Sequence, residues 1–186
     1  MRIISGDFGG RKLVAVSGNN TRPTADKVKG SMFNMLGQFF AGGSALDLYA
    51  GTGALGIEAV SRGMAHATLV DKAYPAIQAI KQNVATTKAE DRFTVLKMPV
   101  DKAIKTLAEA GQQFDLILAD PPYAKQEVMD QLAAFLAEDL LAPAGRVLLE
   151  TGLDVDYPEV IPGYTKLRHQ TYGVAQVLIL KRGEDA

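Results

Sequence analysis

The chain contains no cysteine and no tryptophan, and it has only two histidines among its 186 residues. Without cysteine there can be no disulfide bond, no thiolate metal ligand and no thiol nucleophile. His66 and His169 stand far apart in the sequence and belong to no cluster with metal-ligand spacing. We therefore expect no bound metal, and we interpret both histidines as polar residues near strand ends.

Long apolar runs are missing as well. No stretch approaches the ~20 consecutive apolar residues that cross a bilayer. Met1–Asp7 leads straight into polar and glycine residues, without the apolar segment of a signal peptide. We expect a cytoplasmic protein without membrane contact, and because nothing indicates an obligate dimer, we expect a monomer. The length and the 47% hydrophobic content suit one domain with a sizeable core.

The formal net charge of −1 conceals an asymmetry along the chain. Residues 1–30 hold six of the 20 basic residues but only two of the 21 acidic ones. A basic N-terminal segment on an acidic body indicates a polyanionic partner at one end, although a solvated surface explains the charge equally well.

The first 43 residues predict an extension rather than a strand–helix repeat. Two short apolar runs, 2–5 and 11–16, flank a glycine-rich turn and predict an antiparallel hairpin. A helix is expected over about 25–40, with Thr24 as its N-cap and Gly42-Gly43 at its end.

From Ser44 onward, short apolar strands alternate with amphipathic helices. The expected strands are 45–49, 67–70, 93–96, 114–119 and 146–150, and the expected helices are 54–62, 73–87, 100–110 and 126–137. This alternation predicts a parallel, doubly wound sheet. The last two strands, 164–171 and 174–181, are joined by two residues only, which requires antiparallel pairing. We predict one α/β Rossmann-like domain over 44–186, with a mostly parallel seven-stranded sheet, preceded by the extension 1–43.

A glycine-rich loop follows the first predicted strand of this domain. Gly51, Gly53 and Gly56 have the spacing G-x-G-x-x-G, which lets a backbone approach a ligand closely beside a helix N-terminus. Asp71 ends the second strand, 20 residues after Gly51, where a carboxylate can accept hydrogen bonds from ribose hydroxyls. These features fit either a dinucleotide or S-adenosylmethionine.

Two further features favour S-adenosylmethionine. The first strand of the repeat begins only at residue 44, whereas dinucleotide-binding folds usually open with it. Asp47 lies just before the glycines, where its charge would repel a pyrophosphate but suits the positively charged methionine end of S-adenosylmethionine.

The sequence Asp120-Pro121-Pro122-Tyr123 follows the fourth strand, so we expect it at the same edge of the sheet. An exocyclic base amine is a poor nucleophile because its lone pair is delocalised into the ring. The Asp120 carboxylate and the Pro121 carbonyl can accept its N–H bonds and free that lone pair. Two prolines stiffen the turn and remove donors, and Tyr123 offers a face on which a base can stack. The pattern predicts methyl transfer to a base amine.

These segments resemble a known family. Asp47–Glu58 resembles motif I of class I S-adenosylmethionine-dependent methyltransferases, and 120–123 matches the (Asp/Asn)-Pro-Pro-(aromatic) motif of the branch that methylates amines. Residues 2–6, 10–13, 21–28 and 32–36 resemble the opening of the bacterial small-subunit (16S) rRNA (guanine-N2)-methyltransferase family. The likeness covers nearly the whole chain.

The resemblance implies a reaction and a set of site residues. It implies methylation of the 2-amino group of one guanine in ribosomal RNA, within small ribosomal subunits or their assembly intermediates, with S-adenosylhomocysteine as the product. Residues 120–123 would hold the base. The implied cofactor contacts are Asp47, Tyr49, Ala50, Gly51, Thr52, Gly53 and Asp71, and the implied RNA contacts are Arg2, Arg11, Lys12 and Arg22.

The chain departs from the family pattern at two places. Asp71 stands where a glutamate is more usual, and the shorter side chain should still reach a ribose diol. After the third strand, Met98 or Pro99 occupies the position of an acidic or amide residue that contacts the adenine, and Asp101 is the candidate substitute.

Three other functions are compatible with the sequence. An adenine-N6 methyltransferase acting on DNA or RNA uses the same motif logic. The glycine spacing also allows a nicotinamide-dependent oxidoreductase, and the fold alone allows a non-catalytic RNA-binding domain. The identity of the methylated base distinguishes the adenine-N6 methyltransferase from the main interpretation. A nicotinamide retained by the protein would indicate the oxidoreductase, and the intact motifs argue against a non-catalytic domain.

Overall fold

The computed structural model describes residues 1–17, 23–121 and 125–186, but not the side chains of residues 23–25, 125 and 126. Arg22, Pro122 and Tyr123, three of the predicted site residues, lie outside this part of the chain. Across the described residues, no helix is long and apolar enough to cross a membrane.

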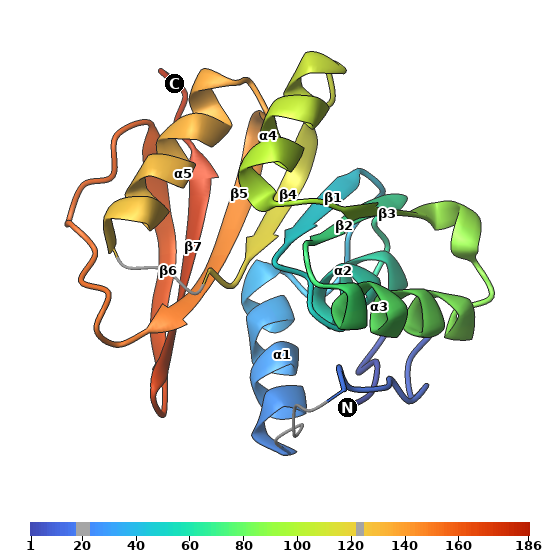
Figure 1. Ribbon diagram of the computed structural model, residues 1–186. Coiled ribbons are helices and arrows are strands. Elements are labelled where there is room, and N and C mark those ends of the chain that lie inside the picture. Colours follow the sequence, from blue (N-terminus) through green and yellow to red (C-terminus); the bar gives the residue numbers. More distant parts are fainter. Residues whose placement is uncertain (18–22, 122–124) are drawn as a thin grey trace.

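A single seven-stranded sheet organises the molecule (Figure 1). Its strands are β1 (Ser44–Leu48), β2 (His66–Asp71), β3 (Phe93–Lys97), β4 (Phe114–Ala119), β5 (Leu141–Gly152), β6 (Tyr164–Tyr172) and β7 (Ala175–Arg182). They lie in the order β3-β2-β1-β4-β5-β7-β6. The first five are parallel, and β7 pairs antiparallel with both β5 and β6. The predicted sheet, including its antiparallel C-terminal hairpin, is confirmed.

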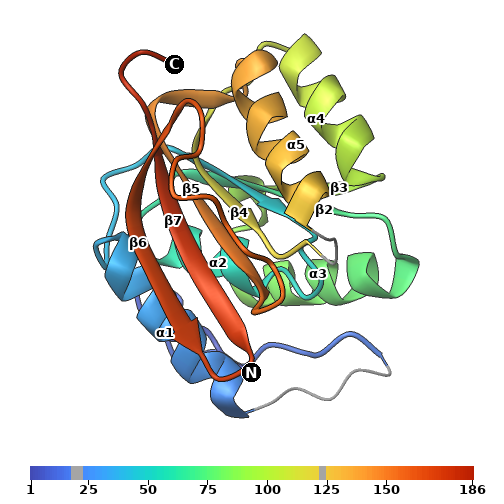
Figure 2. The same ribbon diagram turned by 90° about the vertical axis from the view of Figure 1, so that its left-hand side faces the viewer.

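Helices cover both faces of this sheet (Figures 1 and 2). They are α1 (Pro23–Leu36), α2 (Ala54–Ser61), α3 (Tyr74–Thr86), α4 (Val100–Glu109) and α5 (Lys125–Ala137). Helices α1, α2 and α3 pack on one face, where Phe33, Ile57 and Ile80 join one buried cluster. Helices α4 and α5 pack on the other, where Ile104 and Phe135 join a second.

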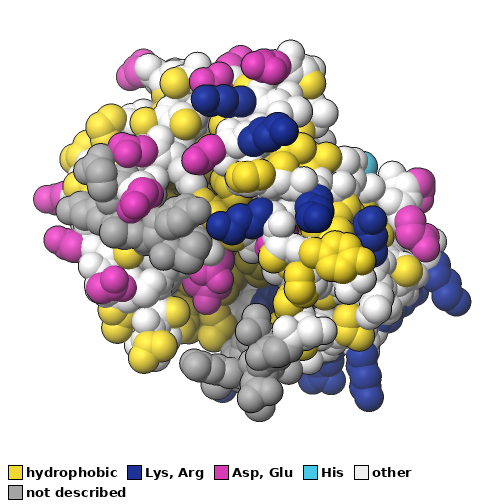
Figure 3. Space-filling view, viewed as in Figure 1, with side chains coloured by type: hydrophobic (Ala, Val, Ile, Leu, Met, Phe, Trp, Pro, Cys, Tyr) yellow, Lys and Arg dark blue, Asp and Glu magenta, His cyan; other side chains and the backbone are white. Residues whose placement is uncertain are grey.

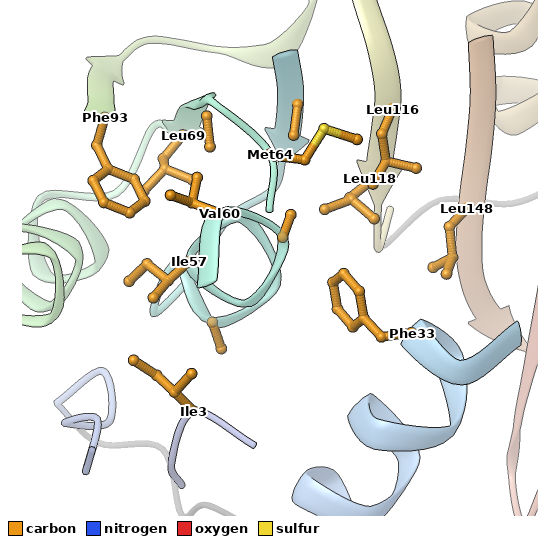
Figure 4. Close-up of a cluster of buried hydrophobic side chains, with 14 of the residues drawn as sticks. Ile3, Phe33, Ile57, Val60, Met64, Leu69, Phe93, Leu116, Leu118 and Leu148 are labelled. Atoms are coloured by element: carbon orange, nitrogen blue, oxygen red, sulfur yellow. The ribbon is translucent and has the colours of Figure 1, made fainter. Parts of the chain in front are cut away.

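Figure 4 shows how the first cluster joins distant parts of the chain. Ile3 of the N-terminal segment points toward Ile57 of α2, whereas Phe33 of α1 lies on the other side of that helix, and all three are fully buried. Leu118 of β4 lies beside Phe33 in the same cluster. The N-terminal extension therefore shares its core with the sheet.

Three predicted helix and strand ends are wrong. Helix α1 ends at Leu36, not near residue 40, because Gly37 adopts a left-handed φ of 111°. The N–H groups of Gly37 and Gln38 then donate to the carbonyls of Asn34 and Phe33, which closes the helix end. The helix starts at Pro23, so Thr24 lies inside it and is not its N-cap. Strand β5 begins at Leu141, five residues before the expected start, since the ladder continues through an irregular register.

The N-terminal hairpin forms, but its ladder is short. One bridge joins Arg2 and Lys12, flanked by hydrogen bonds such as Ile3 N–H to the Arg11 carbonyl at 2.9 Å. The next backbone groups bond to the helices instead. Phe8 N–H donates to Ser61 Oγ at 3.0 Å, and Val14 N–H donates to Asn83 Oδ1 at 2.7 Å.

Glu58 of α2 anchors this segment from within the core. Its carboxylate, 0% exposed, accepts hydrogen bonds from the N–H groups of Ile4 and Ser5 at 2.8 and 3.3 Å. Lys29 Nζ and Arg62 Nε lie 3.7 and 3.5 Å from its oxygens. Burial lowers the pKa of Lys29, and the charge of Glu58 opposes that shift. One buried anion thus holds the N-terminal segment, α1 and α2 together.

We expect Glu58→Gln to destabilise the fold strongly, because it leaves Lys29 and Arg62 buried without a counter-charge. The free energy of unfolding should fall by about 3–5 kcal/mol in urea titrations. The exposed Glu109→Gln on α4 is the matched control and should stay within about 0.5 kcal/mol of the parent protein. Equal effects of the two substitutions would contradict the anchoring role.

Candidate active site

The carboxyl ends of the parallel strands bring the predicted motifs to one edge of the sheet. The glycine loop follows β1, Asp71 is the last residue of β2, and Asp120 directly follows β4. Strand β1 pairs with both β2 and β4, so the loop stands between the two aspartates. The predicted gathering of these segments at one edge is therefore what the strand order produces.

Steric limits explain the glycine spacing. Gly51 and Gly53 adopt φ values of 59° and 80°, a region that favours glycine. Gly56, in the first turn of α2, needs space instead: a Cβ there would lie 2.2 Å from Leu69 Cδ2. Its N–H donates to Asp47 Oδ2 at 2.9 Å. Tyr49 also has a positive φ, 57°, so the loop holds strain in a residue with a side chain.

Asp71 braces the loop from the neighbouring strand. Its Oδ2 accepts the Gly51 N–H at 2.9 Å, and its Oδ1 accepts the Ala73 N–H at the same distance. Each carboxylate oxygen has a second lone pair for a ligand hydroxyl. Asp71 therefore orients the loop and keeps acceptor capacity.

A cavity of about 880 Å³ opens beside the loop. Its lining comes from the N-terminal segment, α1, the loop after β1, the ends of β4 and β5, and the turn between β6 and β7. Of the predicted cofactor residues, Asp47, Tyr49, Ala50, Gly51 and Thr52 line it. Asp120 lines it as well, and Figure 3 shows a hollow in this face with acidic side chains at its rim. Figure 2 shows the β6–β7 hairpin running down beside α1.

Three carboxylates shape the electrostatics of this cavity. Asp47 is 1% exposed, and burial raises its pKa to about 7, with smaller contributions from Asp120 and Asp71 and an opposing one from the Gly56 N–H. Desolvation also raises the pKa of Asp120, whose side chain faces the cavity and is exposed to solvent there. Burial, and then the charge of Asp120, raise the pKa of Glu150 to about 7. The cavity thus favours cations and hydrogen-bond donors.

Several other predicted contacts do not line the cavity. Gly53, Asp71 and Asp101 are not part of its lining, and Asp101 is an exposed residue in the first turn of α4. Arg2 and Lys12 are exposed at the N-terminal hairpin. Arg11 is half-buried, and its guanidinium donates to the carbonyls of Thr86 and Thr87 at 2.9 and 2.8 Å.

Glu150 and Asn83 are two residues at the site that were not predicted. Glu150 lies in β5 next to Asp120, which follows β4, and an acidic residue at the end of the predicted apolar strand 146–150 was the available signal. Asn83 of α3, 1% exposed, donates to the Thr52 carbonyl at 2.9 Å and to the Val14 carbonyl at 3.0 Å. No local pattern marks Asn83, because its partners come from two distant segments.

The strand order, the antiparallel β7 and the glycine loop before α2 define the class I, S-adenosylmethionine-dependent methyltransferase fold. Residues 1–181 match the family described as Conserved hypothetical protein 95, and the chain belongs to that family.

Similar proteins are found among curated sequences and solved structures. The chain is 41% identical to YlbH of Bacillus subtilis, named as a candidate rRNA methyltransferase, over 98% of this chain and 99% of that one. It is 30% identical to Ribosomal RNA small subunit methyltransferase D of Escherichia coli, over 98% and 90%. The structure of an Escherichia coli protein named as a candidate methyltransferase, yhhF, superposes with a TM-score of 0.82 at 30% identity, over 98% and 97%. The resemblance stated from the sequence is confirmed.

The raised pKa of Glu150 predicts a pH-dependent stability. The folded protein binds this proton more tightly than the unfolded chain, so stability falls as the pH rises from about 4.5 through about 7. Glu150→Gln should therefore be more stable than the parent protein by roughly 1–3 kcal/mol at pH 8 and differ little at pH 4. Urea unfolding at both pH values measures this, with the exposed Glu138→Gln as control. A difference that does not grow with pH would be evidence against the desolvated carboxylate.

Proposed function

We propose that the cavity binds S-adenosylmethionine and that the protein transfers its methyl group to the 2-amino group of a guanine in small-subunit ribosomal RNA, leaving S-adenosylhomocysteine. One observation carries the proposal: Asp120 faces the same cavity as Asp47 and the glycine loop. A methyl donor and an amine acceptor can therefore meet there.

The lining of the cavity and Asp71 beside it fit this cofactor. Asp47 provides a carboxylate for the α-amino group of the methionine moiety, and Asp71 has acceptor capacity for the ribose hydroxyls. Lys27 of α1 lines the cavity and supplies a positive charge for the cofactor carboxylate. The anionic lining disfavours a pyrophosphate, which argues against a nicotinamide dinucleotide. When bound, S-adenosylmethionine supplies an electrophilic methyl group on sulfur.

The protein's part in the reaction is to position and deprotonate the amine. Asp120 accepts one N–H of the base amine and takes up the proton that the nitrogen loses on methylation. Pro121 is buried and offers its carbonyl as a second acceptor, while Pro122 and Tyr123 complete the proposed base site from the sequence motif. Holding nitrogen, methyl and sulfur in line can contribute about 7–11 kcal/mol to the barrier reduction.

The choice of ribosomal RNA rests on the names of two relatives. YlbH is named as a candidate rRNA methyltransferase, and the Escherichia coli relative is named as a methyltransferase of small-subunit ribosomal RNA. A guanine amine inside a helix is out of reach of a buried methyl donor, so the target base must be unstacked or flipped. Adenine-N6 methylation is the second candidate, because Asp120 serves either amine.

Labelling identifies the base. Small ribosomal subunits that lack the modification are incubated with methyl-labelled S-adenosylmethionine, the RNA is digested, and the labelled nucleoside is identified. We expect N2-methylguanosine, and we expect Asp120→Ala to reduce kcat by about 10²- to 10³-fold while it binds S-adenosylhomocysteine normally.

The exposed Asp156→Ala is the matched control for loss of an aspartate and should retain full activity. Label in N6-methyladenosine would favour the second candidate, and no label on subunits, free rRNA or duplex DNA would refute methylation of nucleic acid. Full activity of Asp120→Ala would remove Asp120 from the reaction.

We propose further that residues 1–43 form the RNA-docking extension of a methyltransferase domain over 44–186. Arg2 and Lys12 are exposed beside each other at the bridge of the hairpin, on the segment that lines the cavity through Met1 and Val16. Arg22 belongs to the same basic segment by sequence. Arg11 adds its charge there while its guanidinium holds α3.

Substitution separates docking from folding. The double variant Arg2→Gln/Lys12→Gln should raise the KM for subunits by about tenfold, with kcat little changed and a weaker dependence on salt. Arg11→Gln should in addition lower the free energy of unfolding by about 1–3 kcal/mol, because two partly buried carbonyls lose their donor. Steady-state kinetics at several salt concentrations and urea unfolding measure the two effects. An unchanged KM in the double variant would exclude docking through these side chains.

A further inference from the structure

Three neighbouring strands each place a carboxylate on the same face of the sheet. Strand β4 lies between β1 and β5, and Ala119 pairs with Leu149, so Asp120 and Glu150 occupy the next matching positions. Leu118 and Leu148, two residues earlier, both belong to the cluster beneath α1. Because side chains alternate along a strand, Asp120 and Glu150 point to that same side, where the cavity lies.

The order along this edge separates two ends of the cavity. Asp47 and the glycine loop lie on one side of Asp120, and Glu150 lies on the other. Asp47 is engaged with the Gly56 N–H. By contrast, no hydrogen bond or ion pair joins the Glu150 side chain to any other residue in the described part of the chain. Glu150 is therefore an acceptor on the side of Asp120 away from the cofactor loop.

Keeping Glu150 in this position is unfavourable for the empty protein. Burial and the charge of Asp120 both raise its pKa. A structural role would be served better by a neutral side chain, whereas a ligand that brings donors to both carboxylates offsets the cost. Such a ligand must present neighbouring donors to two acceptors that come from adjacent strands.

We infer that Glu150 selects guanine by accepting its N1–H while Asp120 accepts an N–H of the 2-amino group. Guanine carries these donors on neighbouring atoms of its Watson–Crick edge. Adenine presents a lone pair at N1 beside its amine, which a carboxylate repels. The inference rests on the proposed function and adds the group that distinguishes the two candidate bases. Glu150 takes no proton from the base and serves only recognition.

The base 2-aminopurine tests this directly, because it keeps the 2-amino group but has a lone pair at N1. We compare kcat/KM for subunits carrying guanine or 2-aminopurine at the nucleotide that labelling identifies. The parent protein should prefer guanine by about 10- to 100-fold. In Glu150→Gln the preference should fall to within about threefold, since an amide can accept from one base and donate to the other. The Glu138→Gln control should keep the parent's preference.

Each other result has a distinct meaning. A guanine preference that persists in Glu150→Gln would assign recognition to another group, and loss of S-adenosylhomocysteine binding in calorimetry would place Glu150 at the cofactor. Either outcome overturns the inference while the proposed function stands. Absence of any guanine methylation by the parent protein would instead overturn the proposed function. Urea unfolding of the same samples verifies that each variant is folded.

Discussion

The hydrogen bond from the Gly56 N–H to the buried Asp47 carboxylate sets the distance between β1 and α2, and the site depends on that distance. It holds the end of β1 against the first turn of α2, so the residues between them must form a tight loop. Gly56 can approach so closely only because it has no Cβ to meet Leu69. Asp71 then holds the same loop from β2. The end of β1, the start of α2 and the end of β2 are therefore held together around the glycine loop.

The cavity beside this loop is lined by three carboxylates, and their partial desolvation gives the free protein an electrostatic cost. Asp47, Asp120 and Glu150 all have raised pKa values, and burial is the main cause in each case. A sulfonium cofactor with an ammonium group, together with a base that offers N–H donors, carries the complementary charge. The charge of Asp120 therefore raises the pKa of Asp47 at the cofactor end of the cavity and of Glu150 at the base end, although these residues come from different strands.

Much of this could be predicted because it is encoded locally. Short apolar runs alternating with amphipathic segments define the parallel strands, and the two-residue connection at Tyr172-Gly173 defines the antiparallel hairpin. The end of α1 could not be read in the same way, because Gly37 and Gly42 offer equivalent stop signals and only packing decides between them. The role of Glu58 depends on backbone groups 53 and 54 positions away, and Arg11 reaches across 75 residues to Thr86. Contacts of that range leave no periodic trace in a sequence.

Asn83 makes two parts of the molecule a single cooperative unit. Its one amide group bonds to Val14 of the N-terminal segment and to Thr52 of the glycine loop, so neither partner can move away without breaking a buried hydrogen bond that the other shares. Local opening of the N-terminal segment and of the loop should then have a common free energy, and amide hydrogens in both should exchange with solvent together. A partner that binds the N-terminal extension would in this way affect the stability of the glycine loop that lines the cavity.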